Sequence, residues 1–226
     1  MTSKCTRDGR VIPMLTAHDL PTFEFAGEQL VRPDFAGRGL ANVAPTVLRV
    51  LAPKAEPLAL PPLDESVLPA PLTVDVTTVV LLVIDGLGHL QLQREIAAGN
   101  APNIGELLAR AAAGNPSVAY GALTSVFPTT TVAALGSLNS GVVPVEHGLL
   151  GYTLYLPDFD MVAEMIRWGP VNRRISFTDP EFGCSPESFF WEQTIYARLH
   201  AAGVDKTFAV NPMHFGGTAL TRMLHQ

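Results

Sequence analysis

A continuous run of β-branched and apolar residues, TTVVLLVI, occupies residues 77–84. Polar and apolar positions do not alternate along it, which is typical of a strand buried on both faces of a parallel sheet. Asp85 and Gly86 follow directly, and an Asp-Gly pair favours a turn. The pattern therefore predicts a central parallel strand that ends at Asp85.

Helical spacing of apolar residues, bounded by Pro or Gly, predicts four helices, and two further short apolar runs predict strands. The predicted helices cover residues 43–51, 101–113, 131–139 and 192–202, and the further strands cover 120–127 and 206–210. Strands that alternate with helices pair in parallel through right-handed crossovers. We therefore expect an α/β fold whose mostly parallel sheet carries helices on both faces.

Composition along the chain divides it into three segments. Residues 1–36 show no sustained periodicity and are interpreted as an N-terminal arm. Residues 37–73 combine the first helix with six prolines between positions 53 and 71, which predicts a stiff, extended connector. Residues 74–226 then form the α/β domain.

The overall balance of residues narrows the class of protein. Hydrophobic residues make up 47% of the chain and charged residues 16%, which fits strands buried on both faces and argues against disorder. The net charge of −6 gives the chain no excess of positive charge with which to attract nucleic acid or an anionic membrane. A phosphate-bearing substrate would therefore have to be held by local charge.

Cellular location is predicted from three absences in the sequence. Cys5 and Cys184 are too few for a disulfide framework or a four-thiolate zinc site. Residues 1–10 have no apolar core of signal-peptide length, and no apolar stretch approaches the roughly 18 residues of a membrane helix. We expect a soluble, cytoplasmic protein that does not bind membranes.

Asp85 is the first candidate functional residue. Ligands of open α/β sheets bind outside the carboxyl ends of the strands, and an Asp that follows a buried strand lies at that edge. Gly86 and Gly88 would let the chain turn sharply and approach a ligand closely. Considered alone, Asp85 is about equally well explained as a residue that caps the turn.

Thr131 is the second candidate. The segment SVFPTTT (125–131) places hydroxyl groups at the start of a predicted helix, whose free N–H groups and dipole favour an anion. A threonine there could attack phosphorus, although it would need activation by a metal or a base. Threonine is also a good helix N-cap, and for this segment alone capping is the better explanation.

Considered together, these segments resemble the alkaline-phosphatase superfamily, and within it the type I phosphodiesterase/nucleotide pyrophosphatase branch. The resemblance rests on VVLLVIDGLG (79–88), TSVFPTTTVAALGSLNSG (124–141) and PVEHGLLGY (144–152), and it extends over about residues 37–226. The sequence that flanks these motifs is similar to that of an uncharacterised bacterial subgroup. The resemblance implies an alkaline-phosphatase-like fold.

The resemblance also implies roles for the two candidate residues. Asp85 would bind a metal, and Thr131 would be the nucleophile that forms a phosphothreonine and shares that metal. The complete family site holds two divalent ions, for which zinc is the expected element. Thr129 and Thr130 are then interpreted as turn and cap residues.

The family's remaining metal ligands are an Asp four residues before a His, an Asp-His pair and a final His. None of these patterns occurs after Tyr152, where His200, His214 and His225 each stand alone. We therefore expect a chain that is truncated after the N-terminal half of the fold, incomplete at its C-terminus, with part of one metal site and weak or no activity.

Tyr152 and His147, which follow Thr131 in the chain, are the next residues that the resemblance concerns. Nucleotide pyrophosphatases carry an Asn that binds a phosphoryl oxygen near the position of Tyr152. A tyrosine hydroxyl could donate to the same oxygen, but burial in the core explains Tyr152 at least as well. His147 matches the family's His-Gly pair and is interpreted as a loop residue that forms hydrogen bonds.

The sequence thus predicts a metal-dependent hydrolase of phosphodiester or pyrophosphate bonds that acts on a small phosphate ester. A phosphomonoesterase or phosphomutase on the same scaffold is the alternative enzyme. A non-catalytic fragment that binds a partner is the alternative from another class. The sequence predicts no oligomeric state.

Overall fold

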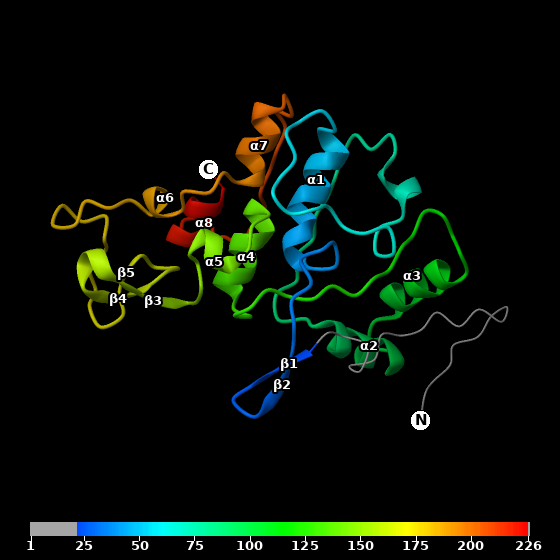
Figure 1. Cartoon of the computed structure of the whole chain (residues 1–226), viewed down its shortest axis with the longest axis horizontal. Helices are drawn as coiled ribbons and strands as arrows, with labels where there is room; N and C mark the ends of the chain where they lie inside the picture. Colours follow the sequence, from blue (N-terminus) through cyan, green and yellow to red (C-terminus); the bar gives the residue numbers. More distant parts are fainter. Residues whose placement is uncertain (1–21, 226) are drawn as a thin grey trace.

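The computed structural model describes residues 22–225 and shows a mixed α/β chain with little sheet (Figure 1). The helices are α1 (Val43–Leu51), α2 (His89–Ala97), α3 (Pro102–Ala112), α4 (Thr131–Ser140), α5 (Pro144–His147), α6 (Pro186–Phe189), α7 (Ile195–Ala201) and α8 (Ala219–Leu224). Short 3-10 helices are η2 (Leu40–Asn42), η3 (Ala70–Thr73) and η4 (Pro157–Phe159). The strands are β1 (Thr22–Phe25), β2 (Glu28–Val31), β3 (Thr153–Leu156), β4 (Met161–Glu164) and β5 (Gly169–Pro170).

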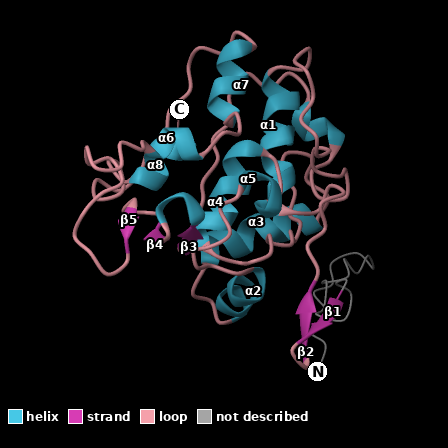
Figure 2. Cartoon of the chain, turned by 60° about the vertical axis from the view of Figure 1, so that its left-hand side comes forward, coloured by secondary structure: helices cyan, strands magenta, loops and turns pink. Residues whose placement is uncertain are grey.

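The sheets of residues 22–225 are small and antiparallel. β1 pairs with β2 in a hairpin that projects from the body, and β4 pairs with both β3 and β5 in a three-stranded sheet (Figures 1 and 2). The hairpin lies in the segment interpreted as an arm, whose first 21 residues lie outside the described part of the chain. The expected mostly parallel sheet is absent from the described residues, and that prediction is wrong for them.

The three predicted strands are not formed. Residues 77–84 and 206–210 lack ladder partners in the described chain, and residues 120–127 keep one parallel bridge, from Thr124 to Gly39. A parallel strand exists through its hydrogen bonds to neighbours, so an apolar sequence without neighbours stays irregular. The side chains of 79–84 are accordingly exposed, with Val80 at 88% and Leu82 at 79%.

The four predicted helices are confirmed as α1, α3, α4 and α7, within a few residues at their ends. Pro102 opens α3, as its missing N–H group favours. Gly141 follows α4 in the left-handed conformation, with φ of 73°, and its N–H donates to the Ser137 carbonyl. These helices could be predicted because their spacing and their stop residues are local properties.

Helix α4 lies at the centre of the molecule, with α1 and α7 on one side and α8 on another (Figure 2). Its side chains are buried over most of its length. Val132 belongs to a core cluster built on Trp168, Phe177 and Met223. A second cluster joins α1 to α7, and α4 contacts both helices.

The connector after α1 is held by a buried polar residue, Asn42. Its side-chain amide donates to the carbonyls of Phe35 and Pro61, each at 2.8 Å, and its Oδ1 accepts the Gly39 N–H at 2.9 Å. Thr46 Oγ1, one turn later, accepts the N–H of Leu63 at 2.7 Å. The proline-rich connector is therefore fixed at its middle, while the three-segment division of the chain stays a prediction.

Among residues 22–225, no helix has the length and apolar character needed to cross a membrane. The longest of the helices described above, α3, has 11 residues.

Lysine substitutions at Val80 and Leu82 test the exposure of residues 77–84. Both side chains are largely in water, so the Val80→Lys/Leu82→Lys variant should change the free energy of unfolding by less than roughly 0.5 kcal/mol. It should also bind less of an apolar dye. Leu149→Ala, at a fully buried position, is the control and should cost roughly 2–5 kcal/mol. A loss above roughly 2 kcal/mol in the lysine variant would show that the segment is buried in a sheet.

Candidate active site

Asp85 lies in a tight turn between the extended residues 77–84 and α2. Its Oδ1 accepts the N–H of Gly86 at 2.9 Å, and Gly86 has a φ of 73°. That left-handed conformation is one that glycine adopts without strain, as expected for a sharp turn. The carboxylate is exposed, and its second oxygen is left available.

Three consecutive threonines at the start of α4 have different roles. Thr129 Oγ1 donates to the Val126 carbonyl at 3.0 Å within the turn. Thr130 is the N-cap, and its hydroxyl accepts the Ala133 N–H at 3.3 Å. The turn and cap roles predicted for these two residues are confirmed. Thr131 is the first residue of the helix and does not cap it, so the alternative interpretation of Thr131 as the N-cap is wrong.

The structure brings Asp85 and Thr131 together. Thr131 Oγ1 donates to Asp85 Oδ2 at 3.0 Å, across 46 positions of the chain, and both side chains are exposed. The N–H groups of Thr131 and Val132 have no acceptor among the described residues, because the cap serves Ala133. Val132 is fully buried, so an anion can approach this helix N-terminus only on the side of the exposed Thr131. The Thr131 hydroxyl and N–H group can then face the same anion.

The spacing of the two oxygen atoms in this pair fits a shared divalent ion. Two oxygens bound to zinc, each about 2.0 Å from it at a tetrahedral angle, lie roughly 3.3 Å apart. The 3.0 Å between Thr131 Oγ1 and Asp85 Oδ2 is close to this value. Over residues 22–225, no group of three or more His, Cys, Asp or Glu side chains gathers into a metal site. The pair therefore fits part of one coordination shell.

His147, the last residue of α5, packs against α4. The ring is buried, its Nε2 lies 3.1 Å from Ser137 Oγ, and its Nδ1 accepts the Leu149 N–H at 3.1 Å. The accepting Nδ1 leaves the ring proton on Nε2, where it faces Ser137. The prediction that His147 forms hydrogen bonds is confirmed, whereas its placement in a loop is wrong, because His147 is the last residue of α5.

Tyr152 lies elsewhere, at the start of the β3–β4 sheet. Its hydroxyl donates to Glu164 Oε1 at 3.0 Å, and this hydrogen bond raises the pKa of the phenol above its ordinary value. The side chain is 49% exposed, so burial in the core is the wrong explanation. No hydrogen bond in the described structure joins Tyr152 to Thr131 or Asp85. A role in substrate binding stays a prediction.

The family model of type I phosphodiesterase / nucleotide pyrophosphatase matches residues 79–213, more than half of the chain. The chain belongs to this family. A search of curated proteins and a search of solved structures each found no match. The matched range of the phosphodiesterase family includes Asp85, Thr131, His147 and Tyr152, which confirms the family identified from the sequence motifs.

The packing that holds helix α4 of this phosphodiesterase-family chain in place was not predicted from the sequence. Gly136 has no side chain where the His147 ring packs, and Ser137 provides the partner of Nε2. The signal was available in the segment LGSLNS, because small residues within a helix indicate close approach by another group. The direct hydrogen bond between Thr131 and Asp85 carried no such signal, since it depends on tertiary folding.

Substituting Gly136 tests this packing. A Cβ atom there would lie 2.6 Å from Cε1 of His147, so Gly136→Ala should lower the free energy of unfolding by roughly 1–3 kcal/mol. Gly217→Ala is the control, because nothing lies within 4 Å of its added Cβ, and it should change stability by less than roughly 0.5 kcal/mol. Equal effects in urea denaturation would contradict the packing of His147 against α4.

The buried imidazole also predicts a pH dependence of stability. Burial lowers the pKa of His147 from 6.5 to about 4, so the unfolded chain binds more protons between these pH values. The stability is fully present above pH 6.5 and should fall by up to about 3 kcal/mol as the pH drops towards 4. Urea denaturation across this range measures the slope. The His147→Gln variant should lose this component, and an unchanged slope would contradict it.

Proposed function

We propose that this chain is a metal-dependent hydrolase of phosphodiester or pyrophosphate bonds that acts through a phosphothreonine at Thr131. Membership of the phosphodiesterase family supports hydrolysis of phosphate esters in general. The observation that carries the finer assignment is the 3.0 Å hydrogen bond between Thr131 and Asp85 at the N-terminus of α4. This bond distinguishes Thr131 from the two threonines before it, because the hydroxyls of Thr129 and Thr130 form hydrogen bonds with backbone groups.

In the proposed first step, Thr131 Oγ1 attacks phosphorus and the ester oxygen leaves with a proton from solvent. Asp85 Oδ2 already accepts the hydroxyl hydrogen and receives the proton as the new P–O bond forms. The N–H group of Thr131 and the positive end of the α4 dipole favour the negative charge that develops on the phosphoryl oxygens. A divalent ion, zinc by expectation, would lower the pKa of the hydroxyl and offset phosphoryl charge when held by Asp85 and Thr131.

In the proposed second step, water attacks the phosphothreonine at phosphorus. The bond from phosphorus to Thr131 Oγ1 breaks, and the threonine hydroxyl is protonated again. The remaining phosphate, which now carries the oxygen of the water, leaves as the second product. Each half-reaction inverts the phosphorus centre, so the overall reaction retains its configuration. The same two residues therefore serve both halves of the cycle.

The proposed substrate is a small phosphate ester. A chain with a net charge of −6 repels polyanions at long range, which favours a small ligand over nucleic acid. The exposure of Thr131 and Asp85 leaves the attacking oxygen accessible from solvent. A cytoplasmic location and an alkaline-phosphatase-like arrangement of the whole domain are part of the proposal.

Turnover of bis(p-nitrophenyl) phosphate with added zinc tests the assignment. Thr131→Ala should reduce the rate by at least roughly 1,000-fold, because no other hydroxyl of residues 22–225 forms a hydrogen bond with Asp85. Thr129→Ala is the matched control and should keep the rate within roughly threefold, since its hydroxyl serves the turn. Circular dichroism should show that both variants are folded.

Three outcomes of this assay discriminate between functions. An unchanged rate in Thr131→Ala would refute the nucleophile. Preference for p-nitrophenyl phosphate over the diester would indicate a phosphomonoesterase. Absence of turnover and of zinc binding in the unsubstituted chain would favour a non-catalytic binding module.

A further inference from the structure

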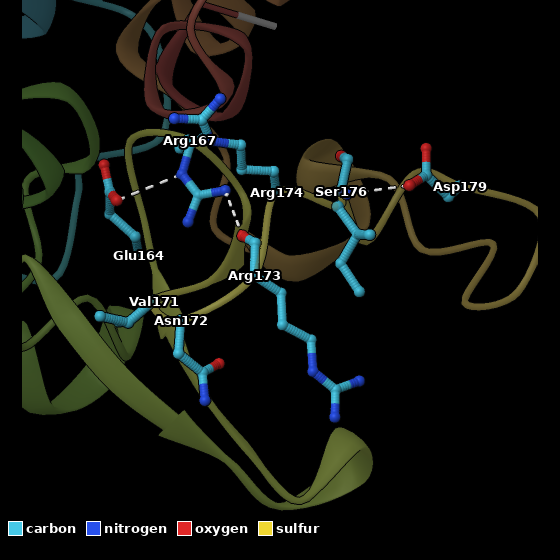
Figure 3. A pocket seen from close by; sticks show the side chains of 9 residues that line it. Glu164, Arg167, Val171, Asn172, Arg173, Arg174, Ser176 and Asp179 are labelled. Atoms are coloured by element: carbon cyan, nitrogen blue, oxygen red, sulfur yellow. Dashed lines mark hydrogen bonds and ion pairs between the residues drawn. The ribbon is translucent and has the colours of Figure 1, made fainter.

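A cavity of about 790 Å³ lies beside the three-stranded sheet, and three arginines line it (Figure 3). Arg167, Arg173 and Arg174 all line it, within eight consecutive residues of a chain that has 15 basic residues in total. The cavity lies within the size range of small-molecule sites. The chain is acidic overall, so this local positive charge stands out from its surroundings.

Arg167 forms the rigid frame of this cavity. Its Nε donates to Glu164 Oε2 at 3.2 Å, and its two terminal nitrogens donate to the carbonyls of Arg173 and Pro170. The indole of Trp168 donates to the Cys184 carbonyl at 2.8 Å and anchors the same loop in the core. The loop that carries Arg173 and Arg174 is therefore held in a fixed shape.

The two carboxylates that line the cavity are already engaged. Glu164 pairs with Arg167 and also accepts the hydroxyl of Tyr152. Asp179 accepts the N–H of Ser176 at 3.0 Å. Within residues 22–225, neither Arg173 nor Arg174 forms an ion pair, and both are exposed. In Figure 3 the Arg174 side chain runs back towards Arg167, whereas Arg173 extends along the other side of the loop.

We propose that this cavity binds a phosphate-bearing anion through the guanidinium group of Arg173, with Arg174 adding positive charge from the other side of the loop. Arginine offers a planar fork of donors that matches the oxygens of a phosphate and binds it with charge-assisted hydrogen bonds. Asn172 also lines the cavity and adds an exposed amide. Arg167 contributes charge, since its nitrogens are used to hold the loop.

This site is separate from the proposed nucleophile in the residues that form it. It uses none of Asp85, Thr131 or the start of α4, and it needs no metal. The cavity is larger than a phosphate ion requires, so it can admit either free phosphate or the phosphate group of a larger ester. The shared ligand chemistry is the doubly charged phosphoryl group.

Isothermal titration of the full chain, in the presence of EDTA and at constant ionic strength, tests this proposal. The ligands are inorganic phosphate, adenosine 5′-monophosphate and acetate. The Arg173→Ala/Arg174→Ala variant should bind both phosphate ligands at least about tenfold more weakly. Arg94→Ala/Arg110→Ala removes the same charge from two exposed arginines on α2 and α3, and it should bind like the unsubstituted chain.

The outcomes separate a built site from general charge attraction. Equal weakening in both double variants, or acetate binding as tightly as phosphate, would overturn the proposal. Adenosine monophosphate binding more tightly than phosphate would identify an ester as the ligand, and equal affinity would identify the free ion. Thr131→Ala should bind phosphate like the unsubstituted chain, so this result is independent of the catalytic assignment.

Discussion

The contact between the His147 ring and Gly136 is the constraint on which the rest of the candidate site depends. It fixes α4 against α5, and α4 also contacts α1, α7 and α8. A buried neutral imidazole with both nitrogens hydrogen-bonded has one stable orientation. The position of the α4 N-terminus, and therefore of Thr131, follows from that orientation.

The site itself depends on a division of roles among adjacent hydroxyl groups. Because Thr130 caps the helix, the next hydroxyl is available to a group from a distant segment. Asp85 is brought to it by a turn that Gly86 makes possible. One helix terminus thus combines a structural hydroxyl and a reactive hydroxyl at consecutive positions.

Local features of the fold could be predicted from the sequence, and long-range features could not. The helices were predicted because Pro102, Gly141 and the apolar spacing act within a few residues. The run 77–84 has the composition of a central strand, but a strand also needs neighbours, and composition does not provide them. The roles of Asp85 and Thr131 were inferred from family motifs, since local sequence alone explained Asp85 equally well, and Thr131 better, as a cap.

The anchoring of the connector by Asn42 and Thr46 has a consequence for chain entropy. Fixing Pro61 and Leu63 divides the long path from α1 to α2 into two independently closed loops. Loop-closure entropy grows slowly with length, by roughly 0.6 kcal/mol for each doubling, so either loop can lengthen at small cost. The anchor prevents a change of length on one side from displacing the other. A change of length in the proline-rich segment before the anchor therefore leaves the turn that positions Asp85 in place.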